Sequence, residues 1–243
     1  AKDGTNWYVY CNSDPINYKD PQGLKCQLIG NKQYWSATFN DMQILTDDRL
    51  EFDEKTGNVT IGSYGNGKMM SGTKLTRELI ESKNFNLLIA RNAGNGNGLS
   101  AASKNGATID IRDVNSSDEM QYFLLKNEDE ETFLQSASKT PVYIALAHEM
   151  IHAYHHMNGD FNKNKGGKHI FFYNNMFGKE YIKTSRNDDE YSTVGLPFIS
   201  LKRLPGSRSM NPYYIQSTYS DITENMIRRE HNLPYRMAYS LFN

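Results

Sequence analysis

The chain of 243 residues carries a formal net charge of −1 and contains 38% hydrophobic and 12% aromatic residues. The aromatic content argues against intrinsic disorder, and the lack of a basic excess argues against a nucleic-acid partner. No apolar run approaches the roughly 18 residues that a membrane-spanning helix needs, so we expect no membrane span.

The first part of the chain is predicted to contain a hairpin and a helix. Residues 49–52 and 58–61 flank a turn that contains Lys-Thr-Gly, which is typical of a β-hairpin. Residues 72–82 carry apolar side chains at helical spacing, with Ser71 or Thr73 available as the N-cap.

Two further strands are predicted before the middle of the chain. Residues 86–90 form an apolar run typical of a buried strand, and residues 107–112 alternate apolar and polar residues as half-buried strands do. The glycine-rich residues 92–98 lie between them. Neither a Gly-Lys-Ser/Thr sequence nor a following helix completes a phosphate-binding loop there, so a turn-rich loop is favoured over a nucleotide site.

The clearest predicted helix spans residues 141–158. Thr140 is a suitable N-cap, and Pro141 suits the first helical position, where its missing N–H is harmless. Gly159 is well placed to end the helix.

This helix contains the sequence His-Glu-Met-Ile-His at positions 148–152. Residues four apart lie on one face of a helix, so His148 and His152 can present two imidazoles to one ion. Neutral imidazole is a favoured zinc ligand, and in H-E-x-x-H enzymes the glutamate, here Glu149, is the general base. The pattern predicts one catalytic zinc ion per chain; two surface histidines on an amphipathic helix are the alternative.

A catalytic zinc site needs a third protein ligand beside an open position. The third histidine of the metzincin motif is absent, and we expect His155 and His156 to support the site or to pack. The better candidates are the acidic residues Asp188, Asp189 and Glu190, placed on a second helix. Carboxylates at that position also suit a helix N-terminus, and both roles are compatible.

Three blocks of the chain together resemble the NleD-like zinc metallopeptidase effectors that bacteria inject into host cells. The first block, residues 148–159, matches H-E-x-x-H-x-x-H followed by Asn-Gly. The second, residues 189–196, matches an acidic pair followed by Thr-Val-Gly-Leu. The third, residues 223–239, matches a pattern of Glu-Asn, Arg-Glu, Pro, Arg and Tyr. The resemblance covers about residues 141–240.

The resemblance implies a zinc endopeptidase that bacteria secrete and that cleaves a protein inside the target or host cell. It assigns Glu190 as the third ligand and gives Asp189 a supporting role. Tyr239 is the candidate catalytic donor that stabilises the transition state, with Arg236 and His231 as further candidates. As a hypothesis, residues 109–112 form the sheet edge that holds an extended substrate by strand addition.

The expected fold is α+β and zincin-like, with a small twisted β-sheet packed on the active-site helix and a helical C-terminal part. We expect one metallopeptidase domain over residues 1–243, in which 1–84 form a possible N-terminal extension and 85–243 the catalytic core. Nothing in the sequence demands more than a monomer. Cys11 and Cys26 either pair or remain free thiols.

Two other functions stay open at this point. One is a zinc hydrolase that acts on a small peptide or a non-peptide amide. The other is a non-catalytic binding module with a degenerate H-E-x-x-H sequence, although such a module has no need of Glu149.

Overall fold

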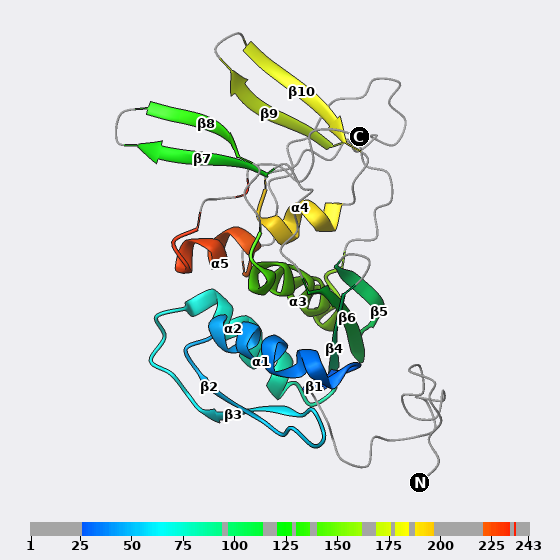
Figure 1. The fold of residues 1–243 in the computed structure, drawn as a ribbon. Helices are drawn as coiled ribbons and strands as arrows, with labels where there is room; N and C mark the ends of the chain where they lie inside the picture. Colours follow the sequence, from blue (N-terminus) through cyan, green and yellow to red (C-terminus); the bar gives the residue numbers. More distant parts are fainter. Residues whose placement is uncertain are drawn as a thin grey trace, which may run out of the picture.

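The computed structural model describes residues 26–93, 97–113, 121–127, 130–136, 140–161, 169–175, 178–184, 188–196, 221–233 and 236. The helices and strands follow one another as shown in Figure 1: β1 (Cys26–Ile29), η2 (Lys32–Tyr34), α1 (Trp35–Ile44), β2 (Arg49–Phe52), β3 (Val59–Ser63), α2 (Met70–Glu81), β4 (Asn86–Asn92), β5 (Gly98–Ser103), β6 (Gly106–Arg112), β7 (Gln121–Asn127), β8 (Glu130–Ser136), α3 (Val142–Asn158), β9 (His169–Asn175), β10 (Gly178–Thr184), α4 (Asp188–Val194) and α5 (Glu224–Glu230).

The main sheet has four strands in the order β1-β4-β6-β5. Strands β1, β4 and β6 are parallel, and β5 runs antiparallel to β6. The pairs β2-β3, β7-β8 and β9-β10 are antiparallel hairpins. The predicted α+β class and the predicted hairpin at residues 49–61 are therefore confirmed.

Strand β6 is an inner strand, so the hypothesis that residues 109–112 form the sheet edge is wrong. Ile109 pairs with Ile89 of β4 on one side and with Leu99 of β5 on the other. The alternation of apolar and polar residues reports which face of a strand is buried, and it carries no information about the neighbours in the sheet.

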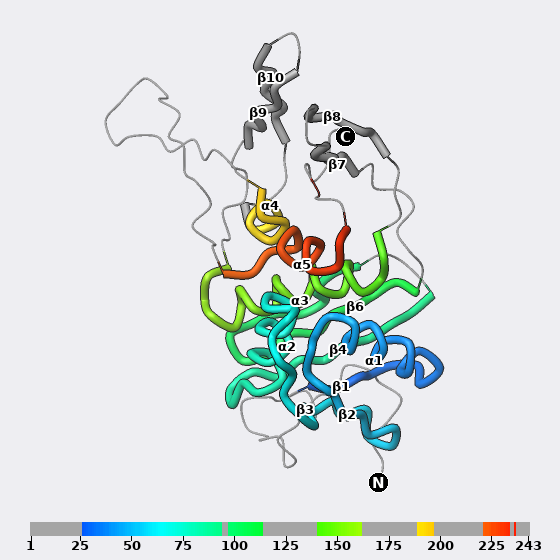
Figure 2. Tube along the Cα trace, turned by 90° about the vertical axis from the view of Figure 1, so that its left-hand side faces the viewer, coloured from blue at the N-terminus to red at the C-terminus, as the bar shows by residue number. Residues whose placement is uncertain are grey.

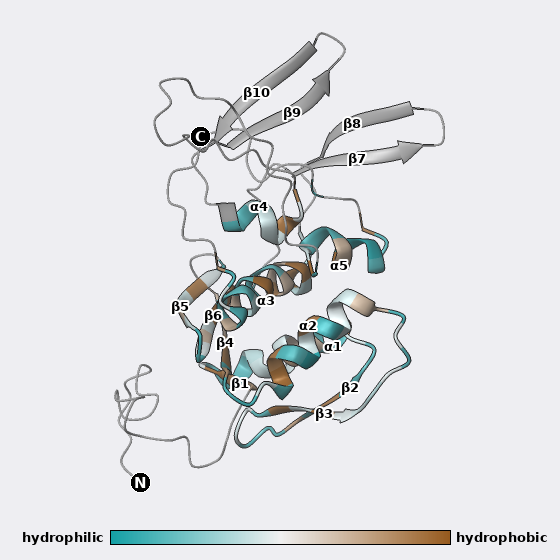
Figure 3. Ribbon diagram, turned by 180° about the vertical axis from the view of Figure 1, so that it is seen from behind, coloured by the Kyte–Doolittle hydropathy of each residue, from teal (hydrophilic) through white to brown (hydrophobic). Residues whose placement is uncertain are grey.

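Helix α3 occupies the centre of the fold (Figure 1). It packs on β5 and β6, with α1 and α2 on one side and α4 and α5 on the other. Apolar side chains from the sheet and the three longest helices, among them Leu28, Leu79, Ile109 and Met150, share one core and are fully buried. Figure 3 shows brown, the colour of hydrophobic residues, in parts of α3 and β4 among white and teal residues. Each such side chain contributes about 1.5–3 kcal/mol through burial.

The helix predicted at residues 141–158 is confirmed as α3. Gly159 follows it with a φ of 76°, a left-handed conformation that glycine adopts without steric cost. The prediction of Thr140 as N-cap is wrong, because Pro141 holds that position with extended backbone. The Thr140 hydroxyl instead accepts a hydrogen bond from Arg228.

The helix predicted at residues 72–82 is confirmed as α2, but its predicted N-caps are wrong. Neither Ser71 nor Thr73 is the cap. Glu230 of α5 accepts the backbone N–H groups of Ser71 and Gly72, at 2.6 and 3.0 Å. A carboxylate is favoured there because the first N–H groups of a helix lack partners and carry partial positive charge. Helices α2 and α5 are in contact, and Figure 2 shows α5 close to the start of α2.

Among the residues that the structure describes, no helix is long and apolar enough to cross a membrane. Cys26 is a buried free thiol in β1, and burial raises its pKa to about 12. It is therefore unreactive at neutral pH. Cys11 lies outside the described residues.

The ion pair between buried Asp48 and partly exposed Arg77 makes stability depend on pH. Hydrogen bonds from Arg77, at 2.5 Å, hold the pKa of Asp48 below its usual range. Such a carboxylate stabilises the folded chain above its unfolded pKa of about 3.9 and loses this effect as pH falls through its folded value. We expect Asp48→Asn to cost about 1–2 kcal/mol at pH 7.

The measurement is urea unfolding of both proteins from pH 7 to pH 3. The difference in unfolding free energy between wild type and Asp48→Asn should shrink below about pH 4 as Asp48 becomes protonated. A difference that stays constant over this range would contradict the assignment.

Candidate metal centre

Three side-chain atoms converge on one point between α3 and α4. The Nε2 atoms of His148 and His152 lie 3.1 Å apart, and each lies 3.2 Å from Oε2 of Glu190. The two imidazoles meet because they are four residues apart on α3, and Glu190 reaches them from the first turn of α4. These three residues form a group that could hold a metal ion.

The triangle fits a divalent cation. In a tetrahedral zinc site, bonds of roughly 2.0–2.1 Å place neighbouring ligand atoms about 3.3 Å apart, close to the separations of the three atoms here. Two imidazoles and one carboxylate are also a donor set that zinc accepts. The remaining ring nitrogen of each histidine faces a carboxylate, which leaves the Nε2 lone pairs directed at the centre of the triangle.

A second layer of carboxylates holds the imidazoles. Asp189 accepts from Nδ1 of His152 at 2.5 Å and from Nδ1 of His155 at 3.0 Å. Glu224 of α5 accepts from Nδ1 of His148 at 2.8 Å. Partners of this kind fix the ring orientation and the Nδ1–H tautomer, and they make the ligating nitrogen more basic.

These carboxylates favour positive charge on the imidazoles. Burial disfavours the charged form of His148, but hydrogen bonds to Glu190 and Glu224 outweigh it and raise the pKa to about 9. Burial likewise opposes protonation of His152, whose hydrogen bonds to Asp189 and Glu190 raise its pKa to about 10. Protons and a divalent cation would compete for the same Nε2 atoms, so metal binding at neutral pH would release protons.

Asp189 and Glu190 of α4 remain ionised despite their burial. Burial raises the pKa of Asp189, but hydrogen bonds from His152 and His155 outweigh this effect and lower it to about 2. The pKa of Glu190 is lowered in the same way, against burial, by hydrogen bonds from His148 and His152. The centre therefore presents fixed negative charge beside the two imidazoles.

Glu149 lies next to the candidate ligands on α3. It is buried, with 8% of the residue exposed. Its negative charge contributes to the raised pKa of His152. Glu190 is more accessible, since 22% of its side chain is exposed. The centre thus combines a buried carboxylate with a ligand that solvent can reach.

A close approach between α4 and α5 brings the carboxylates to the histidines. Gly195, whose φ is 85°, directly follows Val194, the last residue of α4. A Cβ atom there would lie 2.7 Å from the hydroxyl of Thr223, the residue that caps α5. Only glycine fits this contact without displacing Thr223, which gives a physical reason for the glycine in the second sequence block.

Of the other residues that the sequence singled out for the site, those that the structure describes do not belong to the triangle of converging atoms. Arg236 is buried and its guanidinium contacts Glu224 at 3.1 Å. His231 follows α5 and its ring lies 5.1 Å from that of Tyr143. His156 stacks on Phe161, with ring centroids 3.9 Å apart. Tyr239 and the side chain of Asp188 lie outside the described residues.

Sequence reasoning assigned no role to Glu224. Its position beside His148 follows from the packing of α5 on α3, which joins residues 76 positions apart. The only signal was its presence in the third block, next to an asparagine and followed by two arginines.

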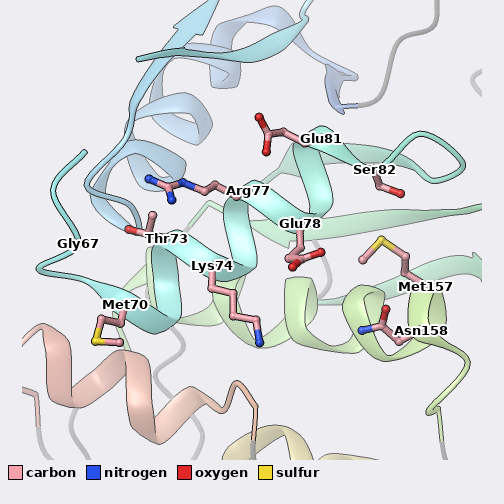
Figure 4. A pocket seen from close by; sticks show the side chains of 10 residues that line it. All are labelled: Gly67, Met70, Thr73, Lys74, Arg77, Glu78, Glu81, Ser82, Met157 and Asn158. Carbon is pink, nitrogen blue, oxygen red and sulfur yellow. The ribbon is translucent and has the colours of Figure 1, made fainter. Parts of the chain in front are cut away.

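A cavity of about 730 Å³ lies away from this centre. Figure 4 shows it along the outer side of α2 and the C-terminal end of α3, with Lys74, Arg77, Glu78, Met157 and Asn158 in its lining. None of the candidate ligands lines it. Its lining carries both positively and negatively charged side chains.

Comparison with known proteins identifies the family to which the chain belongs. A search of curated proteins and a search of solved structures found no match. Residues 61–239, which are 179 of the 243 residues, match the model of peptidase family M91, described as an effector protein. The match contains the H-E-x-x-H helix and the acidic pair, and it confirms the resemblance found in the sequence. The chain therefore belongs to the M91 family of effector peptidases.

Proposed function

We propose that the chain is a zinc-dependent endopeptidase in which His148, His152 and Glu190 hold one zinc ion and Glu149 is the general base. The observation that carries the proposal is the triangle of Nε2, Nε2 and Oε2 atoms with sides of 3.1–3.2 Å. The two supporting carboxylates strengthen it, because Asp189 and Glu224 orient the ligating histidines.

The chain's own residues supply proton transfer and orientation. A bound zinc ion would polarise the scissile carbonyl and make a water molecule more acidic. Glu149 takes the proton of the attacking water and delivers it to the leaving amine. Its low exposure keeps the proton away from bulk solvent during this transfer. We retain Tyr239 as the proposed donor to the transition state, as the family resemblance implies.

The proposal extends to fold, substrate and place of action. A helix with two histidine ligands and a glutamate from a following helix is the arrangement of zincins with a His₂Glu set, and we propose that fold here. Residues 26–81 share one core with α3, which supports a single catalytic domain. Membership of an effector family supports secretion by bacteria and cleavage of a protein inside the target cell.

The test is a search for new protein N-termini in a host-cell lysate treated with the purified chain. We expect a small set of cleaved proteins, lost on treatment with a zinc chelator and restored by stoichiometric zinc. Cleavage that survives complete metal removal would overturn the zinc-dependent mechanism. Activity on small peptides or amides alone would favour the small-substrate hydrolase.

A further inference from the structure

Glu224 lies at the centre of a buried network of charges behind His148. Besides the contact with His148, its Oε1 accepts from Nε of Arg228 at 2.6 Å, and its Oε2 accepts from Arg236 at 3.1 Å. Only 1% of Glu224 and of Arg228 is exposed, and 4% of Arg236. Two guanidinium groups thus surround one carboxylate, away from solvent.

The two arginines act on the same carboxylate in different ways. Arg228 lies four residues after Glu224 on α5 and fixes Oε1, so that Oε2 is turned toward His148. Arg236 comes from the segment after α5 and shares Oε2 with that histidine. With Oε1 bound to Arg228 and Oε2 shared by His148 and Arg236, both oxygens of the carboxylate are occupied as acceptors.

We propose that Glu224 is a positioning residue for His148, and that Arg228 and Arg236 hold its carboxylate in the orientation this requires. The inference rests on the proposed role of His148 as a zinc ligand. It means that α5 and the segment after it complete the metal centre, although neither provides a ligand.

A purely structural role is the competing explanation. Buried ion pairs could tie α5 to the rest of the molecule without any effect on the metal, and removing one partner would then only lower stability. The same helix offers a matched control. Glu230 is an acidic residue of α5 that accepts backbone N–H groups of α2 and contributes nothing to the triangle.

The experiment compares Glu224→Gln, Arg236→Gln and Arg236→Lys with Glu230→Gln. Zinc affinity is measured by competition with a chelator, and the geometry by the absorption spectrum of the cobalt-substituted proteins. We expect Glu224→Gln to bind zinc about 10- to 100-fold more weakly, with an altered cobalt spectrum and a lower kcat at nearly unchanged KM. Arg236→Gln should show a smaller loss in the same direction, partly restored in Arg236→Lys.

Glu230→Gln should lower the unfolding midpoint while it leaves zinc affinity and the cobalt spectrum unchanged. Glu224→Gln could fail to fold because it leaves two buried arginines without a carboxylate. In that case the double variant Glu224→Gln/Arg236→Gln is used in place of the single variant, because it has the same net charge as the wild-type network. Wild-type zinc affinity and spectrum in a folded Glu224 variant would overturn the inference. Failure of the wild-type chain itself to bind zinc would instead overturn the proposed function.

Discussion

Replacement of Glu149 by glutamine is expected to lower kcat/KM for protein cleavage by about 10²- to 10⁴-fold. Glutamine keeps the size of the side chain but cannot accept a proton from water at neutral pH. Because Glu149 is not one of the three converging donors, zinc binding should persist within a fewfold of the wild-type affinity.

The measurement pairs an N-terminus profiling assay with zinc content on the same preparations. Glu54→Gln, which changes an exposed glutamate in the same way, is the control and should retain full activity. Equal cleavage by wild type and Glu149→Gln would remove Glu149 from the base role. Loss of zinc in Glu149→Gln would show instead that the residue holds the metal.

The second large effect is expected at α4, where the sequence offered Asp188, Asp189 and Glu190 as candidate third ligands and the family resemblance favoured Glu190. Oε2 of Glu190 completes the triangle, whereas Asp189 contacts the Nδ1 atoms of His152 and His155. Glu190→Gln should therefore weaken zinc binding by roughly a hundredfold or more, since it removes a charged ligand. Asp189→Asn should lower zinc affinity by only about tenfold, because the asparagine side chain can still accept a hydrogen bond from His152.

Chelator competition on the two variants gives the order of the losses directly. Each is isosteric with the residue it replaces, so differences in packing contribute little. A larger loss in Asp189→Asn than in Glu190→Gln would exchange the roles of the two residues.

The sequence predicted those parts of the fold that local patterns encode. Alternating and apolar runs marked β4 and β6, and Pro141 and Gly159 bounded α3 closely. Strand β5 was missed because its sequence, Gly-Leu-Ser-Ala-Ala-Ser, has no apolar alternation and its place depends on pairing with β6. The start of α2 was misjudged because its capping carboxylate, Glu230, comes from the far end of the chain.

The same distinction applies to the candidate site. His148 and His152 meet because a helix places residues four apart on one face, which the sequence alone reveals. Glu190 required the family resemblance, since its approach depends on how α4 packs against α3. The partners of Glu224 depend on the packing of α5 and on a residue after it, and no local pattern encodes such contacts.

The most direct test of the central claim is the zinc content of the purified chain after metal removal and reloading. We expect about one zinc ion per wild-type chain and almost none in His148→Ala and His152→Ala. His156→Ala, on the same helix but stacked on Phe161, should keep the wild-type content. A wild-type chain that holds no zinc, or a His148→Ala/His152→Ala double variant that holds as much as wild type, would contradict the account.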